Sequence, residues 1–157
     1  MPEPLPVPIG LRLSQAARAV ARAFDEALAA AGGTLPVWLI LLNLKVRQPG
    51  TQRQLAEAVG ITEATLTHHL NAMEADGLIA RTRDAANRRV QVVTLTGQGD
   101  AVFLALRAAA IAFDGRLHAG FADGELDALG GQLARLAANA GSPLSGDTPW
   151  AGLAGQH

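Results

Sequence analysis

The sequence predicts a mainly α-helical fold with about six helices and one small β-hairpin. Apolar residues recur at helical spacing in several segments of the chain. Residues 90–95 instead alternate and are rich in β-branched side chains, which indicates a strand that pairs with residues 78–83. Charged residues make up only 17% of the chain and apolar residues 49%, so we expect a subunit interface that covers part of the apolar surface.

The composition divides the chain into five parts. Residues 1–7 form a proline-rich arm and residues 141–157 a tail rich in Gly, Ser and Pro, and both are expected to be flexible. Residues 8–35 are expected to form an N-terminal dimerisation helix. Residues 97–140 are expected to form C-terminal dimerisation helices. Residues 36–96 hold the remaining helices and the hairpin, which we expect to form one domain.

Strong local signals mark the helices of this domain. Residues 36–46 are apolar nearly all round, which is typical of a buried central helix. Thr51 and Gln54 form a capping-box pattern at the start of a short helix. Gly60 indicates a turn, and Thr62 is placed to cap the next helix. These signals predict two helices joined by a tight turn.

Two further helices are predicted in the C-terminal part. Thr96 and Gly97 open a long helix, and Asp123 is placed to cap a last helix that has leucines along one side. Gly130 and Gly131 in the middle of this last helix cost about 1 kcal/mol each relative to alanine. The helix is therefore either interrupted there or approached closely by a neighbour.

Several classes of function are excluded or disfavoured. The chain has no cysteine, which excludes disulfides, thiolate zinc sites and thiol-based redox sensing. Its longest apolar run, residues 35–44, is far shorter than the roughly 20 residues of a membrane span, and the N-terminal prolines argue against a signal peptide. His68 and His69 point about 100° apart on a helix, and no nucleophile elbow, phosphate loop or zinc-protease motif is present. We therefore expect a cytoplasmic, non-enzymatic protein without a metal, a cofactor or a membrane partner.

The order helix, turn, helix, strand, basic loop, strand is the pattern of a winged helix-turn-helix, here spanning residues 36–96. Such a domain inserts its second helix into the major groove of double-stranded DNA. With Leu66 at the centre of the buried face, this helix presents His68 and Asn71 outward, and Asn71 can pair with adenine through both of its amide atoms. The candidate DNA-binding residues are Thr51, Arg53, Thr62, Ala64, Thr65, Thr67, His68, Asn71, Arg83, Arg88 and Arg89.

The charge of this domain is balanced. Five arginines lie between residues 51 and 96, and five acidic residues in the same segment compensate them. The whole chain has a net charge of −1, so a local patch rather than bulk charge must attract DNA. A winged-helix module that binds a protein partner and has lost DNA binding is the alternative interpretation.

The domain resembles the MarR family of bacterial transcriptional regulators. The resemblance rests on Leu55-Ala56, Gly60-Ile61, the stretch 65–70, Leu78-Ile79 after Gly77, Arg81, the wing ending in Arg89, and Leu95-Thr96 before Gly99. It implies a triangular homodimer with interlocked terminal helices, acting as a ligand-responsive repressor on a pseudo-palindromic operator. It also implies that Arg89, with Arg88 beside it, reaches into the minor groove next to the recognition helix.

One position in the wing departs from the family pattern. The family usually has an aspartate two residues before the wing arginine, where it holds the arginine by an ion pair, and this chain has Asn87 there. Asparagine can form a hydrogen bond but supplies no charge. Asp84, across the loop, is the candidate substitute for that ion pair.

The resemblance further implies a small aromatic or carboxylate ligand between the dimerisation helices and the winged domain. His69 lies at the edge of the buried face of its helix, where an aliphatic residue is usual, and is a candidate polar or pH-sensitive handle. Phe24, Trp38 and Arg81 are candidates to line the same cavity. The alternative is that His69 bonds to backbone and Trp38 belongs to the core.

Overall fold

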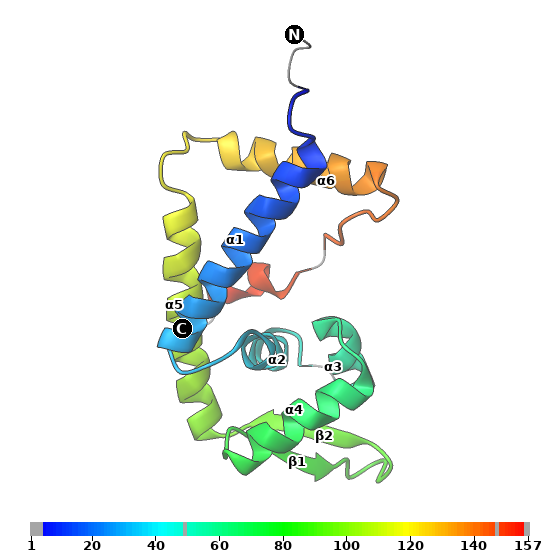
Figure 1. Ribbon diagram of the computed structural model, residues 1–157. Helices are drawn as coiled ribbons and strands as arrows, with labels where there is room; N and C mark the ends of the chain where they lie inside the picture. Colours follow the sequence, from blue (N-terminus) through cyan, green and yellow to red (C-terminus); the bar gives the residue numbers. More distant parts are fainter. Residues whose placement is uncertain (1–4, 49, 147, 156–157) are drawn as a thin grey trace.

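The computed structural model describes residues 5–48, 50–146 and 148–155. Within these ranges the chain forms six α-helices, one two-stranded antiparallel sheet and one 3-10 helix, η1 (Figure 1). The bounds are α1 Ile9–Ala30, α2 Leu35–Val46, α3 Gln52–Val59, α4 Glu63–Ala75, β1 Ile79–Arg83, β2 Gln91–Leu95, α5 Gly97–Leu117, α6 Glu125–Asn139 and η1 Pro149–Gly155. The mainly helical fold with one hairpin is thus confirmed. Residues 1–4 of the predicted arm lie outside the described residues.

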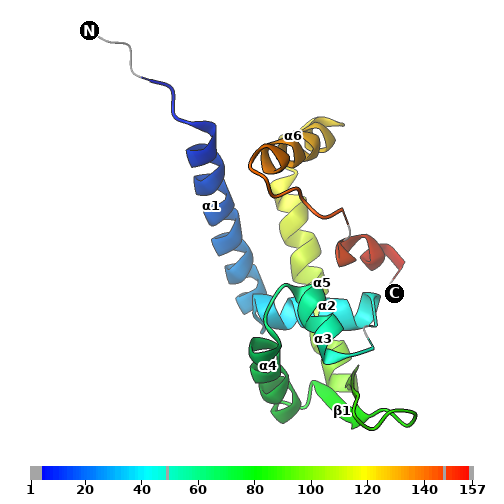
Figure 2. The same ribbon diagram turned by 90° about the vertical axis from the view of Figure 1, so that its right-hand side faces the viewer.

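The long helices α1 and α5 contact each other and form the upright part of the molecule (Figures 1 and 2). Phe24 of α1 packs on Phe113 of α5 with ring centroids 5.1 Å apart. Both views place α6 at one end of α5, and a compact unit of α2, α3, α4 and the hairpin at the other end. The hairpin and the predicted dimerisation helix α6 are therefore separated by the length of α5.

Helix α2 lies at the centre of the compact unit. Thr34 caps its first turn by accepting from the backbone N–H of Val37. Its apolar sequence leaves no polar face to expose, and its side chains from Trp38 to Leu44 are mostly buried. Trp38 stacks on Phe103 of α5 with ring centroids 5.9 Å apart. Because α2 touches α1, α3, α4, α5 and β2, it joins both ends of the chain into one core.

The predicted helix-turn-helix forms as its capping signals indicate. Thr51 and Gln54 make the reciprocal capping box of α3, and Gly60 ends that helix with a left-handed φ of 80°. Thr62 caps α4 by accepting from the N–H of Thr65 at 3.1 Å. Buried Leu66, Leu70 and Met73 form the inner face of α4. The opposite face of α4 is therefore turned to solvent.

The hairpin is fastened directly to the start of α5. Strands β1 and β2 pair antiparallel with Ile79 opposite Leu95. The hydroxyl of Thr96 donates to the backbone oxygen of Gly77 at 2.6 Å and accepts from the N–H of Gly99 at 3.0 Å. The N–H of Thr96 also donates to the oxygen of Leu78 at 3.0 Å. These bonds hold the end of the hairpin, the loop after α4 and the first turn of α5 together.

The C-terminal tail differs from the sequence prediction. Residues 149–155 form η1, which packs on α2 and buries Leu153 to 4% exposure. The prediction of a flexible tail is therefore wrong for this segment, because Leu153 is buried against the core. Residues 147, 156 and 157 of that tail lie outside the described residues.

Helix α6 differs from its prediction in two details. Gly124, with φ of 83°, precedes the first turn in place of the expected cap Asp123, and the Glu125 carboxylate accepts from the N–H of Ala122 at 2.7 Å. The helix continues through Gly130 and Gly131, where a Cβ would meet only open space. The alternative of an interrupted helix is excluded.

Within the described ranges, no single helix combines the length and the apolarity of a membrane span. Helices α1 and α2 have the required length and apolarity only when they are taken together, and the chain bends by 77° between them.

Candidate DNA-binding surface

The outer face of α4 gathers five of the candidate residues. Ala64, Thr65, Thr67, His68 and Asn71 are all exposed. They lie opposite the buried face of the helix, as its periodicity predicts. The result is a surface of small and hydrogen-bonding side chains on α4, and this helix lies at the end of the molecule that carries the hairpin (Figure 2).

The threonine hydroxyls on this helix already have intramolecular partners. The oxygens of Thr62 and Thr65 lie 2.9 Å apart, within hydrogen-bond distance. Thr67 donates to the backbone oxygen of Glu63 at 2.9 Å. The methyl groups of Thr65 and Thr67 are therefore freer to contact DNA than their hydroxyl hydrogens are, and such methyl groups suit the methyl of thymine.

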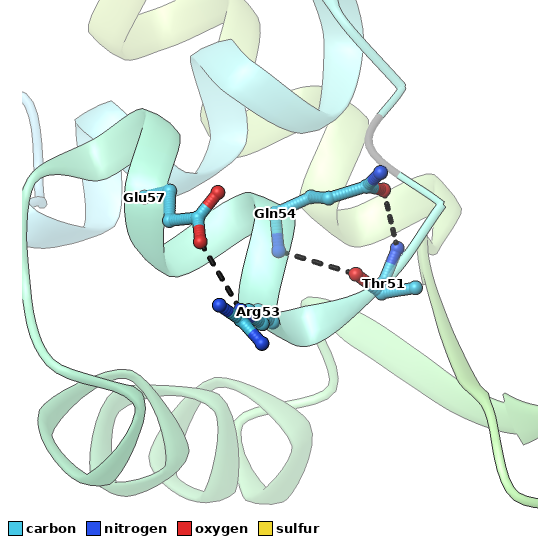
Figure 3. A network of polar contacts seen from close by, with 4 residues as sticks. All are labelled: Thr51, Arg53, Gln54 and Glu57. Carbon is cyan, nitrogen blue, oxygen red and sulfur yellow. Dashed lines mark hydrogen bonds and ion pairs between the residues drawn. The ribbon is translucent and has the colours of Figure 1, made fainter.

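The start of α3 presents a second polar group of candidates (Figure 3). The side-chain oxygen of Gln54 accepts from the N–H of Thr51 at 3.2 Å and from the N–H of Gly50 at 3.0 Å, which fixes this turn. Arg53 is 76% exposed and pairs with Glu57 at 3.2 Å. An exposed pair of this kind contributes at most about 1 kcal/mol, so Arg53 can exchange Glu57 for a phosphate at little cost.

Backbone hydrogen bonds shape the wing, which is the loop of residues 84–90. The Asp84 carboxylate accepts from the N–H of Ala86 at 2.6 Å and from that of Asn87 at 3.1 Å. Asn87 in turn accepts from the N–H of Arg89 at 3.2 Å. Asp84 therefore orders the loop backbone. The sequence suggested that it would replace the missing aspartate by pairing with Arg89, and it does not.

The basic side chains of the wing, and that of Arg83 at the adjoining end of β1, are exposed. Arg83, Arg88 and Arg89 all face solvent, and within the described part of the chain none of the three has an ion-pair partner. Arg89 also lines a hollow of about 290 Å³ together with Thr51 and Gln52 at the start of α3. The wing and α3 thus share one edge of the candidate surface.

Arg81 has a role that the sequence did not reveal. From β1 it donates through Nη2 to Asn71 Oδ1 at 2.7 Å and through Nε to Glu74 Oε2 at 3.1 Å. Only 16% of its side chain is exposed. The hydrogen bond from Arg81 holds the pKa of the Glu74 carboxyl below its ordinary value. Arg81 is therefore bound to α4, and its expected part in lining a ligand cavity stays a prediction.

The four residues expected to share that cavity belong to four different elements. Trp38 is 2% exposed and stacks on Phe103, as a core residue does. Phe24 lies on α1 and Arg81 on β1, while His69 is half-buried on α4. Trp38, His69 and Arg81 do not line the hollow that Phe24 borders, so a ligand cavity shared by all four stays a prediction.

Phe24 does border an apolar hollow of about 520 Å³ between α1 and α5. Its lining residues are Ala17, Val20, Ala21, Phe24, Ala110, Phe113, Asp114, Leu117 and Trp150. Trp150 from η1 closes one side, which the sequence did not predict because the tail was expected to be flexible. In the described parts of the chain, no three His, Asp or Glu side chains come close enough to hold a metal ion.

Comparisons with known proteins agree on one family. The model of the MarR family matches residues 34–90. An uncharacterized HTH-type transcriptional regulator of Bacillus subtilis (strain 168), YwoH, is 25% identical over 117 residues, which cover 74% of this chain and 85% of that protein.

Solved structures extend the match beyond the winged domain. A probable transcriptional regulator from Pseudomonas aeruginosa is 31% identical, with 82% of this chain and 96% of that chain covered and a TM-score of 0.69. The transcriptional repressor CouR, solved on a 23-mer DNA duplex, is 28% identical, with 83% and 92% covered and a TM-score of 0.69. The chain belongs to the MarR family of transcriptional regulators.

Proposed function

We propose that the protein is a homodimeric repressor that binds a pseudo-palindromic DNA duplex. The observation that carries the proposal is the common location of three elements. The outer face of α4, the start of α3 and the wing arginines all lie at one end of the molecule (Figure 2). The repressor CouR, whose fold this chain shares, was solved on DNA. A DNA target places the protein in the cytoplasm.

The proposed contacts follow from the shape of B-DNA. The major groove is about 12 Å wide and admits one α-helix, so α4 enters it with His68 and Asn71 toward the base edges. The wing then lies over the adjacent minor groove, whose negative potential attracts Arg89. Arg53 and Arg88 are placed for phosphates. Because each subunit offers few cations, two half-sites bound together are needed for high affinity.

Apolar exposure supports the homodimer. Helix α6 buries none of its residues against the rest of the chain, and Leu129 on it is 38% exposed. Further large apolar side chains are exposed on α1 and α5, among them Leu11, Ile111 and Leu117. Surfaces of this kind normally mark an interface. The open flank at Gly130 and Gly131 leaves room for a close helix–helix approach.

The apolar hollow beside Phe24 is the proposed effector site. Its walls suit an aromatic ring, and its one charged side chain, Asp114, favours a hydroxyl donor over a carboxylate. A phenol therefore fits better than an aromatic acid. Thermal-shift screening of matched phenols and benzoates checks this, since a binder raises the apparent stability by mass action. A stabilising benzoate without a stabilising phenol would reverse the assignment.

Capture of genomic DNA tests the main proposal. The purified protein is mixed with fragmented genomic DNA, and bound duplexes are sequenced, with sedimentation giving the subunit number. We expect a dimer and an enriched sequence with two-fold symmetry. A dimer that enriches no duplex would favour a winged-helix module that binds a protein partner. A monomer in sedimentation would contradict the homodimer.

A further inference from the structure

Asn71 lies on the exposed face of α4, the helix that the proposed function places in the major groove, and the present inference rests on that function. Its amide is already engaged on one side. Arg81 Nη2 lies 2.7 Å from Asn71 Oδ1. A guanidinium carries only donors, so the amide atom that faces it must be the oxygen. The contact thus sets which way the amide of Asn71 is turned.

Arg81 is itself held in place by Glu74, three residues beyond Asn71 on the same helix. Nε donates to Glu74 Oε2 at 3.1 Å, and Nη2 forms an ion pair with the same oxygen. Only 16% of the Arg81 side chain is exposed, compared with 40% of Glu74. The hydrogen bond from Arg81 lowers the pKa of Glu74, which shows that the contact favours the charged carboxylate. One arginine of β1 is thereby fixed against two residues of α4.

This arrangement conflicts with the recognition of adenine that the sequence suggested for Asn71. Bidentate pairing with adenine needs the amide oxygen to accept from the N6 amino group while the amide nitrogen donates to N7. Here Arg81 takes one of the two lone pairs of the oxygen and places a positive charge beside it, which opposes the approach of the adenine amino group. The Nδ2 hydrogens remain free for DNA.

Guanine is the base whose edge fits the free Nδ2 hydrogens of Asn71. The edge of guanine itself presents two acceptors, O6 and N7, in the major groove and no donor. We propose that Arg81 determines the base preference of Asn71, converting it from a reader of adenine into a reader of guanine. Arg81 is in this sense a positioning residue, because it acts on the base through the amide of Asn71.

Selection from random duplexes tests the inference at a single base position. The position is defined as the one where Asn71→Ala loses the preference of the unmodified protein. We expect the unmodified protein to prefer guanine over adenine there by about fivefold or more. Arg81→Met keeps an unbranched apolar stem without the guanidinium donors, so we expect the preference to move to adenine.

Two further variants make the test independent of folding defects. Asn71→Asp keeps a partner for Arg81 and removes both Nδ2 hydrogens, so guanine should no longer be preferred although circular dichroism shows a folded protein. Arg83→Met removes the same charge from the same strand. We expect this control to bind all duplexes more weakly without changing the preferred base.

The outcomes separate this inference from the proposed function. Adenine selected by the unmodified protein, guanine retained by Asn71→Asp, or an unchanged preference in folded Arg81→Met each overturns the role of Arg81. If Arg81→Met does not fold, the unmodified protein and Asn71→Asp decide alone. An unmodified dimer that enriches no duplex overturns the proposed function, and this inference with it.

Discussion

Arg107 of α5 donates a hydrogen bond from Nη2 to the backbone oxygen of Leu153, at 3.0 Å and across 46 residues of sequence. Leu153 is 4% exposed. Gly152 lies so close to Val46 that an added Cβ would stand 2.2 Å from its Cγ1. The C-terminal segment is therefore held to α5 by a hydrogen bond and packed on α2 by a close backbone approach, with the Leu153 side chain buried.

Leu153→Ala should lower the free energy of unfolding by about 2 kcal/mol. This is the low end for a buried leucine, because a terminal segment can also detach without unfolding the rest. Urea denaturation measures the change. Leu144→Ala is the matched control, since this leucine of the same tail is 63% exposed and should contribute less than about 0.5 kcal/mol. Equal effects of the two substitutions would contradict the docking of η1.

Gly99→Ala should destabilise the junction between the hairpin and α5. An added Cβ would lie 1.9 Å from the backbone oxygen of Leu78, which also accepts from the N–H of Thr96. Because backbone cannot give way as a flexible side chain can, we expect a loss of about 3 kcal/mol in thermal unfolding, at the upper end for overpacking.

Gly97→Ala, two residues earlier in the same helix, is the control. Its added Cβ meets nothing within 4 Å, and its φ is not positive. Alanine there should leave stability unchanged or raise it by up to about 1 kcal/mol. A Gly99→Ala protein as stable as Gly97→Ala would show that the close approach to Leu78 is wrong.

Arg89→Ala should weaken binding to all duplexes. If the side chain contacts phosphate and sugar beside the minor groove, its loss removes about one unit per subunit from the slope of log affinity against log salt. Titrations of labelled duplex over a salt series measure that slope. Arg12→Ala removes the same charge from the far end of α1, away from the hairpin, and should leave the slope unchanged (Figure 1). An unchanged slope in Arg89→Ala would remove the wing from the interface.

Acid should weaken the tie between β1 and α4. The pKa of Glu74 is lower in the folded protein than its ordinary value of 4.5, chiefly because of the hydrogen bond from Arg81. The stability that this pair contributes is therefore fully present above 4.5 and is lost as the pH falls through the lower folded value. Urea midpoints measured from neutral pH to below 4.5 should fall less steeply for Glu74→Gln than for the unmodified protein.

The control for that titration is Glu57→Gln, which removes one exposed carboxylate from α3. It should follow the acid dependence of the unmodified protein. If Glu74→Gln does so as well, the Arg81 pair does not contribute to stability.

Features governed by neighbouring residues could be predicted from the sequence. Thr51 and Thr62 cap the helices they were expected to cap, and the inner face of α4 follows from its period. Capping and amphipathicity depend on residues within about one helical turn, so a single sequence contains them. The exposure of the candidates on α4 follows from the same period, and their contacts with DNA remain a prediction.

Features that depend on distant parts of the chain could not be predicted. Arg81 and Asn71 belong to different elements, and only the docking of β1 beside α4 brings them together. Trp38 could have lined a cavity until the stacking of Phe103 placed it in the core. Asp84 could equally pair with an arginine or with loop amides, and only the shape of the wing decides between them.

The hydrogen bonds of Thr96 couple any tilt of α5 to the position of the hairpin. A helix of 21 residues is about 31 Å long, and its first turn is tied to the hairpin and to the loop after α4. A tilt of about 10° at the α6 end would therefore sweep the hairpin end through about 5 Å. This exceeds the base-pair spacing of about 3.4 Å. A small rearrangement where α1 meets α5 can thus change the spacing of the two α4 helices in a dimer by more than one base pair. The two helices would then no longer fit successive turns of the duplex.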